Sequence, residues 1–212
     1  MPARGFSEVH ADFVADTEAL LQRFNQPIPN AGPYATTCPP VHDDAQSLLV
    51  VLLQNSWSTY SREILEVSAE AALPTLTWRQ LQPSPMMSMY TGARQAVREA
   101  ARIVADTMGY CDPVWHKPEF TIRVAAQLKV QNYEEIFYAL SSTLTPSHVN
   151  WVRNYVVHPS DRTRAGYSKV AAAVGDPRAD LGPLLRTQQV GGVTLFEKWV
   201  RELQATAEQA AG

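Results

Sequence analysis

Prolines divide this sequence into segments, and the apolar residues between them recur at helical spacing. The chain has 15 prolines among its 212 residues, clustered mainly within residues 27–40 and 74–85. A proline inside a helix removes a hydrogen bond and clashes with the preceding turn, so helices end close to these residues. Alternating apolar and polar runs joined by glycine turns, which are typical of sheets, are almost absent. The sequence therefore predicts an all-α fold, an antiparallel helical bundle with an extra N-terminal helix and short peripheral helices.

Capping and stop residues predict where the helices begin and end. Ser7 is the expected N-cap of a first helix that stops before Pro27. Asp43 or Asp44 is the expected N-cap of a long helix that runs to about Ala72. We expect residues 1–42 to form an N-terminal extension and residues 43–212 to form the bundle. Further helices are predicted over residues 87–108, 121–128, 132–140, 145–158 and 164–174, and a last helix is predicted after Thr194. Gly109 is the expected stop of the first of these, and Thr145 is an expected N-cap. Capping boxes are expected at Asn132/Glu135 and at Thr194/Glu197.

Composition excludes several broad classes of protein. Hydrophobic residues make up 45% and charged residues 18% of the chain, which is ordinary globular usage. A formal net charge of -3 argues against a general basic coat, so binding to nucleic acid would require a local positive patch. Cys38 and Cys111 lie far apart, and two unpaired thiols are favoured over a single bridge. The N-terminus lacks a signal-peptide pattern and the longest strongly apolar run, Leu48 to Leu53, is too short to cross a bilayer, which predicts a cytoplasmic protein without a membrane segment.

Patterns typical of metal and cofactor sites are missing from the sequence. It contains no glycine-rich phosphate loop, GxSxG, HExxH or CxxC, and no two histidines stand four apart. His42-Asp43-Asp44 could hold a cation, but helix capping by the aspartates is favoured. Trp115 and His116 lie in a loop where an aromatic ring could stack on a base, although packing over the end of the bundle is favoured. We expect neither a metal nor a cofactor.

The segment WVRNYVVHPSDRTR, residues 151–164, combines three chemically useful side chains. Arg153 is a permanent cation with several N–H donors, Asn154 is an amide, and His158 titrates near neutral pH. Cleaving RNA without a metal requires such groups, because the ribose 2′-hydroxyl must lose a proton and the charge developing on the phosphate must be stabilised. Arg153, Arg162, Arg164 and Lys169 also make residues 153–169 basic, with Asp161 as the single acidic residue there.

Helical geometry alone does not bring Arg153 and His158 together. Residues five apart in an ideal helix point about 140° away from each other, whereas Asn154 and His158, four apart, share a face. His158 precedes Pro159, which predicts that it lies outside the helix at its end. Two copies of the segment meeting across a dimer axis could supply the convergence, with Trp151 and Tyr155 at that interface or in the core behind the motif. The alternative is an ordinary helix end with a solvated arginine and a histidine favoured by the helix dipole.

Arg153-Asn154-Tyr155-Val156-Val157-His158 resembles the RNxxxH form of the signature of the HEPN superfamily, an arginine and a histidine separated by four to six residues. The helical context is similar as well, from LLVVLLQNSWSTYSREILEVSAE through PEFTIRVAAQLKVQNYEEIFYALSS to LFEKWVRELQATAEQAA. The likeness covers about residues 44–210 and is strongest to the stand-alone bacterial HEPN families, including the RiboL-PSP-HEPN group. Only the RNxxxH segment is specific, and residues 1–42 have no counterpart.

This resemblance implies a homodimeric all-α ribonuclease with its two motifs facing one another. The implied reaction is metal-independent and leaves a 2′,3′-cyclic phosphate and a 5′-hydroxyl, in a toxin or phage-defence effector that an antitoxin protein could restrain. His158 would be the acid/base group, Arg153 the phosphate ligand and Asn154 the residue that orients them, with Arg162, Arg164 and Lys169 as further RNA contacts. Ser160 stands where HEPN toxins silenced by a nucleotidyltransferase carry tyrosine, which does not support that partner. An inactive HEPN-like module that binds RNA or a nucleotide, and a helical scaffold with a coincidental motif, remain alternatives.

Overall fold

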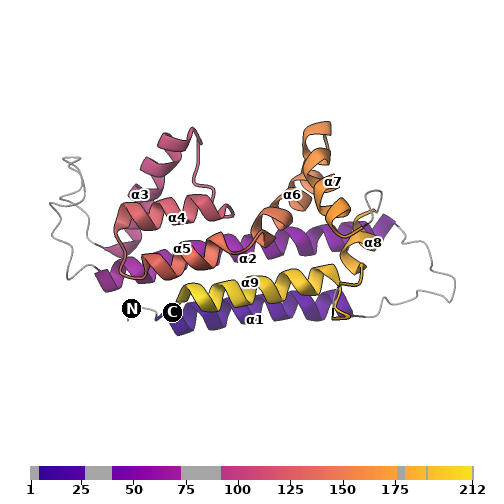
Figure 1. Cartoon of the computed structure of the whole chain (residues 1–212), viewed down its shortest axis with the longest axis horizontal. Helices are drawn as coiled ribbons and strands as arrows, with labels where there is room; N and C mark the ends of the chain where they lie inside the picture. Colours follow the sequence, from indigo (N-terminus) through magenta and orange to yellow (C-terminus); the bar gives the residue numbers. More distant parts are fainter. Residues whose placement is uncertain (1–4, 27–39, 73–91, 176–179, 190, 212) are drawn as a thin grey trace. The chain divides into compact units, whose positions relative to one another are not determined.

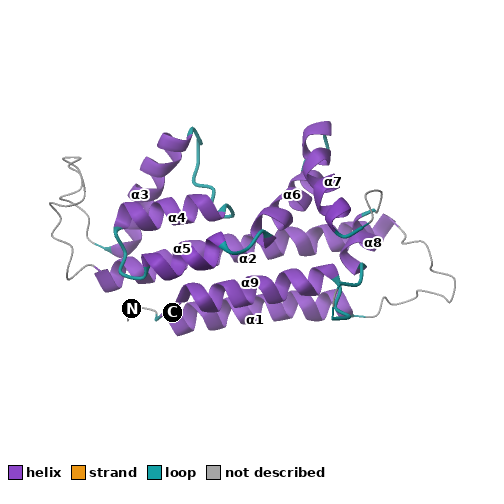
Figure 2. Ribbon diagram, in the orientation of Figure 1, coloured by secondary structure: helices purple, strands orange, loops and turns teal. Residues whose placement is uncertain are grey.

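The computed structural model describes residues 5–26, 40–72, 92–175, 180–189 and 191–211. Most of these residues are helical, and the described part of the chain contains no β-strand (Figure 1, Figure 2). Gln188 and Thr194 form an isolated antiparallel β-bridge, which does not extend into a strand. The helices pack against one another, so the all-α bundle predicted from the sequence is confirmed. None of the described helices has the length and apolar character needed to cross a membrane.

The helices follow one another along the chain with short connections wherever the connection is described. They are α1 (Phe6–Asn25), α2 (Pro40–Ala72), α3 (Ala93–Met108), α4 (Pro118–Leu128), α5 (Tyr133–Ser141), α6 (Thr145–Val157), α7 (Asp161–Ala173), α8 (Leu181–Arg186) and α9 (Leu195–Ala211). They form two compact units, of which unit 1 contains residues 1–13, 57–143 and 205–212, and unit 2 contains residues 14–56 and 144–204. Helices α1, α2 and α9 contribute to both units. The predicted boundary near residue 42 stays a prediction.

An aromatic cluster forms the core of unit 1 where α1, α2 and α9 meet. The ring of Phe13 lies 5.9 Å from that of Trp57 and 4.9 Å from that of Tyr60, measured between ring centroids. The hydroxyl of Tyr60 donates a 2.6 Å hydrogen bond to the carbonyl of Ala207. Burial raises the pKa of this phenol, so it remains protonated and keeps the bond. The residues α3 buries are alanines and valines at helical spacing, and a left-handed Gly109 ends this helix as predicted.

In unit 2, α1 and α9 lie side by side, and α6 and α7 pack against each other (Figure 1). Phe24 of α1 stacks on Phe196 of α9 with ring centroids 4.7 Å apart, and the guanidinium of Arg186 lies 4.7 Å from the centre of the Phe24 ring. About two turns of α9 further along, the amide of Gln204 donates to the hydroxyl of Thr17 at 3.0 Å. These contacts hold α1 and α8 against α9 within unit 2.

Several predicted helix boundaries are wrong by a few residues. Helix α1 begins at Phe6, before Ser7, and its first turn is closed by the Glu8 carboxylate, which accepts the N–H of Gly5 at 2.9 Å. Helix α2 begins at Pro40 and contains both aspartates predicted to cap it. Helix α4 begins at Pro118, where a proline suits the first turn, three residues earlier than predicted. The predicted start of α3 near Met87 lies outside the described residues.

The predicted caps of the later helices also differ from the structure. Asn132 is the N-cap of α5 but makes no side-chain cap bond, and its amide donates to the carbonyl of Ala210 at 3.5 Å. Thr145 is inside α6, because its hydroxyl bonds the carboxylate of Glu202 in α9 and Leu144 takes the cap position. At α9, Thr194 accepts the N–H of Glu197 at 3.3 Å, which is one half of the predicted box.

Candidate functional site

Helix α6 carries the three residues of the predicted motif at its C-terminal end. Val149 and Val152, three apart, are buried and fix the helix on the core of unit 2. Pro146 stands in the first turn, where its missing N–H costs nothing. Pro159 follows the last turn, and His158 takes a φ of -135° and a ψ of 69°, outside the helical region. The prediction that His158 leaves the helix is confirmed.

A short chain of side-chain hydrogen bonds connects Arg153 to the interior of the protein. The Nη1 group of Arg153 donates to Oδ1 of Asn154 at 3.2 Å. The Nδ2 group of Asn154 in turn donates to Oδ1 of Asn150 at 3.1 Å. Asn150 is buried, whereas Arg153 and Asn154 are half-buried. The structure therefore brings Arg153 and Asn154 together and attaches both to a residue that the sequence analysis did not single out.

His158 has a fixed backbone and an exposed side chain. Its N–H donates to the carbonyl of Asn154 at 2.9 Å, and its own carbonyl accepts the hydroxyl of Thr163 at 2.8 Å. Within the described residues, no hydrogen bond joins its imidazole to Arg153 or Asn154 of the same chain. The imidazole is thus exposed on a turn whose backbone is hydrogen-bonded on both sides, and no hydrogen bond pairs it with the arginine in the described chain.

The turn after His158 is held by the capping box at the start of α7. Ser160 accepts the N–H of Thr163 at 3.3 Å, while the N–H of Ser160 donates to the hydroxyl of Thr163 at 3.0 Å. This box starts α7 at Asp161, three residues before the start predicted from the sequence. Ser160, noted above for differing from the family pattern, therefore acts as a helix cap here.

Helices α6 and α7 pack through a small residue and an aromatic pair. A Cβ atom placed on Gly166 would lie 3.1 Å from Cβ of Trp151, so glycine permits this close approach. The rings of Tyr155 and Tyr167 lie 4.5 Å apart between centroids. Trp151 and Tyr155 therefore pack against α7 within one chain, and their role at a dimer interface stays a prediction.

The basic residues predicted to contact RNA lie along α7. Arg162, Arg164 and Lys169 are exposed, and none of them forms an ion pair with a described residue. The ammonium group of Lys169 lies 5.5 Å from the centre of the Trp151 ring, which is within cation–π range. At 3.6 residues per turn, Arg162 and Lys169 share a face of α7, whereas Arg164 points about 160° away from Arg162. The three cations therefore surround the helix and do not form one stripe.

A second histidine, His148, lies one turn from the start of α6 and was not predicted as functional. Its imidazole is half-buried and lies 5.6 Å from the Trp151 ring, measured between centroids. Burial lowers its pKa, Glu202 acts in the opposite direction, and Lys198 reinforces the lowering. His148 is therefore held towards its neutral form at the buried end of the helix that exposes His158 at the other.

Among the described residues, no group of three or more histidine, cysteine or carboxylate side chains is placed to hold a metal ion. Cys111 is exposed with a free thiol, while Cys38 lies outside the described residues.

Trp115 packs edge-on against the buried Phe120 at 5.3 Å between centroids, as the packing alternative for this tryptophan requires. Glu134 and Glu135 are exposed on α5.

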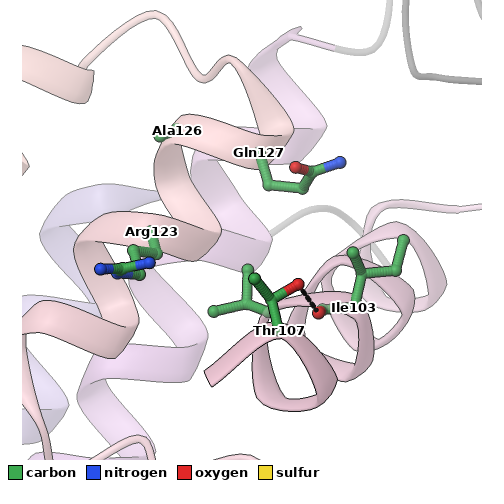
Figure 3. A pocket seen from close by; sticks show the side chains of 6 residues that line it. Ile103, Thr107, Arg123, Ala126 and Gln127 are labelled. Atoms are coloured by element: carbon green, nitrogen blue, oxygen red, sulfur yellow. Dashed lines mark hydrogen bonds between the residues drawn. The ribbon is translucent and has the colours of Figure 1, made fainter. Parts of the chain in front are cut away.

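A pocket of about 290 Å³ lies between α3 and α4 in unit 1 (Figure 3). Its lining residues are Ile103, Val104 and Thr107 of α3 with Arg123, Ala126 and Gln127 of α4. Figure 3 shows the hydroxyl of Thr107 bonded to the carbonyl of Ile103, a contact of 2.8 Å. No described lining residue is a histidine or a carboxylate, so this pocket offers no group that transfers protons near neutral pH. The end of α6 is the better candidate for chemistry.

Comparison of the chain with protein-family models, curated proteins and solved structures found no match. Function must therefore be inferred from the side chains at the end of α6 and along α7.

Proposed function

We propose that this chain is a metal-independent endoribonuclease of HEPN type that works as a homodimer, in a toxin or phage-defence role. The observation that carries the proposal is the arrangement at the end of α6. Arg153 is held by Asn154, and one turn later His158 presents an exposed imidazole from a backbone fixed on both sides. A cation and a titratable group thus stand at the same helix end, beside the basic residues of α7.

The proposed reaction needs no group beyond these side chains and the RNA itself. The imidazole of His158 takes the proton of the ribose 2′-hydroxyl, and the oxygen attacks the adjacent phosphorus. The bond from phosphorus to the 5′-oxygen breaks, and that oxygen takes a proton from a His158 imidazolium, which returns to the neutral imidazole. The products are a 2′,3′-cyclic phosphate and a 5′-hydroxyl. Arg153 stabilises the charge that develops on the phosphate, since only one of its several N–H donors is used by Asn154.

A second copy of the chain completes the site in this proposal. No hydrogen bond joins the His158 imidazole to Arg153 within one described chain, so the two groups have to meet through a substrate or across subunits. A two-fold axis beside the end of α6 would place both motifs in one groove, because closed pairs use the same patch on both partners. An antitoxin protein that covers this groove would be the natural regulator of such an enzyme.

Binding of RNA without cleavage is the second candidate function. It is favoured by the exposed cations Arg162, Arg164 and Lys169, which have no ionic partner among the described residues and need no histidine to contact phosphates. The two candidates differ only in whether RNA is cut, so an activity assay separates them.

The test is cleavage of labelled RNA by purified protein in the presence of EDTA. We expect cleavage by the wild type and a loss of about 10²–10⁴-fold in His158→Ala, the usual value of a proton-transfer group. Arg153→Ala should lose about 10²–10³-fold, the usual value of a donor that stabilises developing charge. Arg98→Ala removes an exposed cation from α3 and is the matched control, with activity retained. Both site variants should keep their helical content, because His158 is exposed and Arg153 is not fully buried. RNA that binds but stays intact supports the second candidate, and cleavage that survives both substitutions places the active site elsewhere.

A further inference from the structure

The buried amide of Asn150 lies at the inner end of the hydrogen-bond chain that reaches Arg153. The residue as a whole is 8% exposed, which places it among the buried polar residues of the described chain. Asn150 precedes Asn154 by four residues, so the two amides lie on the same face of α6. Asn150 offers its oxygen to Asn154 at 3.1 Å, and Asn154 offers its oxygen to Arg153 at 3.2 Å.

The direction of these hydrogen bonds makes the three residues depend on one another. A primary amide has an oxygen that accepts and a nitrogen that donates. Because Asn150 presents oxygen, Asn154 must turn its nitrogen inwards, and its oxygen then faces Arg153. If Asn154 were reversed, its NH₂ group would face the N–H groups of the guanidinium, and neither side could accept. The orientation of Asn150 therefore decides whether Asn154 can hold the arginine.

We propose that Asn150 is a positioning residue, which orients the Arg153 guanidinium through Asn154. This inference rests on the proposed function for its role in RNA cleavage, whereas the orientation of Arg153 is a property of the free protein. An arginine side chain has many rotamers, and a partner fixed to the core restricts them before the substrate arrives. The donors of Arg153 not used by Asn154 are then already directed when a phosphate binds.

The experiment compares Asn150→Leu with Asn150→Asp, each alone and combined with Asn154→Ala. Leucine has a similar size but accepts no hydrogen bond, whereas the carboxylate of aspartate retains an acceptor oxygen for Asn154. We expect Asn150→Leu to lower cleavage by about 10- to 100-fold, the range that misplacing a reacting group produces, and Asn150→Asp to recover most of it. In the Asn154→Ala background, Asn150→Leu should have no further effect, because the link to Arg153 is already lost.

A second readout does not depend on RNA cleavage. In NMR relaxation of the Arg153 side-chain Nε–H group, Asn150→Leu should raise mobility and Asn150→Asp should restore order. Thr121→Val, which removes a buried hydroxyl in unit 1, is the control and should change neither measurement.

The inference is overturned if Asn150→Leu leaves the order of the Arg153 side chain unchanged in the NMR measurement. It is also overturned if Asn150→Leu lowers cleavage by the same factor in the wild-type and Asn154→Ala backgrounds. Equal losses in both backgrounds would mean that Asn150 contributes only to folding. If Arg153 loses order but the wild type cuts no RNA, the positioning role is supported and the ribonuclease proposal fails.

Discussion

The two histidines of α6 lie in different surroundings, and this difference separates a structural from a chemical role. His148 is half-buried near Trp151, and burial lowers its pKa. His158 is exposed at the helix end and bonded only through its backbone. Since a group that exchanges protons with a substrate has to reach it, His158 is the residue of the two that suits catalysis.

The lowered pKa of His148 predicts how stability depends on pH. A histidine whose folded pKa lies below its unfolded value, about 6.5, binds protons more readily when the chain unfolds. Its contribution to stability is therefore complete above pH 6.5 and is lost as the pH falls towards the folded pKa. His148→Gln should reduce the difference in unfolding free energy between pH 7.5 and pH 5.5. The change should be a fraction of the ~1.4 kcal/mol that one pKa unit represents, because the side chain is half-exposed.

Urea unfolding at the two pH values measures this effect. Ser147→Ala, the preceding residue on α6, is the control and should keep the pH dependence of the wild type. A steeper dependence in His148→Gln than in the wild type would contradict the direction given for its pKa.

The sequence predicts which residues form the candidate site, but it does not predict how their side chains connect. Arg153, Asn154 and His158 stand out as a motif, and Pro159 correctly predicts that His158 leaves the helix. The bond from Arg153 to Asn154 and the anchor at Asn150 depend on side-chain rotamers, which a residue pattern does not contain. Asn150 lies four before Asn154, so helical spacing alone was a signal that could have identified it.

At the scale of elements, the sequence predicts that helices exist better than it predicts where they begin. Prolines and Gly109 mark stops because their backbone constraints are local. The start of α6 was misplaced because the Thr145 hydroxyl bonds Glu202, a residue 57 positions away in the chain. Helix α8, Leu181–Arg186, was not predicted, since six residues are too few to show a periodic pattern. Contacts distant in sequence decide such boundaries.

Helix α7 carries the cations that the proposed RNA contact uses, and its geometry predicts that they contribute unequally. Arg162 and Lys169 share one face, and Lys169 lies against Trp151 of α6. Arg162→Gln and Lys169→Gln should each lower the slope of log affinity against log salt by about 0.7, the value of one phosphate contact in a single strand. Arg164→Gln, on the other side of α7, should change it less.

Fluorescence anisotropy with a labelled single-stranded RNA, at several salt concentrations, gives these slopes. The variants are made in the His158→Ala background, so that the RNA remains intact during the measurement. An exposed cation of α3, Arg98, provides the control through Arg98→Gln. A slope that falls as much for Arg98→Gln as for the α7 variants would show that binding is general and not localised to α7.

At the scale of the whole molecule, the proposal places the site between two chains, with both motifs facing one groove beside a two-fold axis. We expect a homodimer in solution. Trp151 and Tyr155 pack against α7 in their own chain but are half-buried, so their exposed parts remain candidates for the contact between subunits. Light scattering at tens of micromolar should give about twice the 23.5 kDa mass of the chain. A mass that stays at one chain under these conditions would rule out a site shared between subunits.

The central claim is that the ribose 2′-hydroxyl is the attacking group, activated by His158 without a metal. It is tested most directly with an RNA oligonucleotide and a matched copy that carries a single 2′-deoxy residue at the cleaved position, both incubated with the wild-type protein in EDTA. We predict that the first is cut to a 2′,3′-cyclic phosphate and a 5′-hydroxyl, and that the second stays intact at that position. Cleavage of the deoxy substrate there, or products with a 5′-phosphate that form only with a divalent metal, would contradict the proposed chemistry.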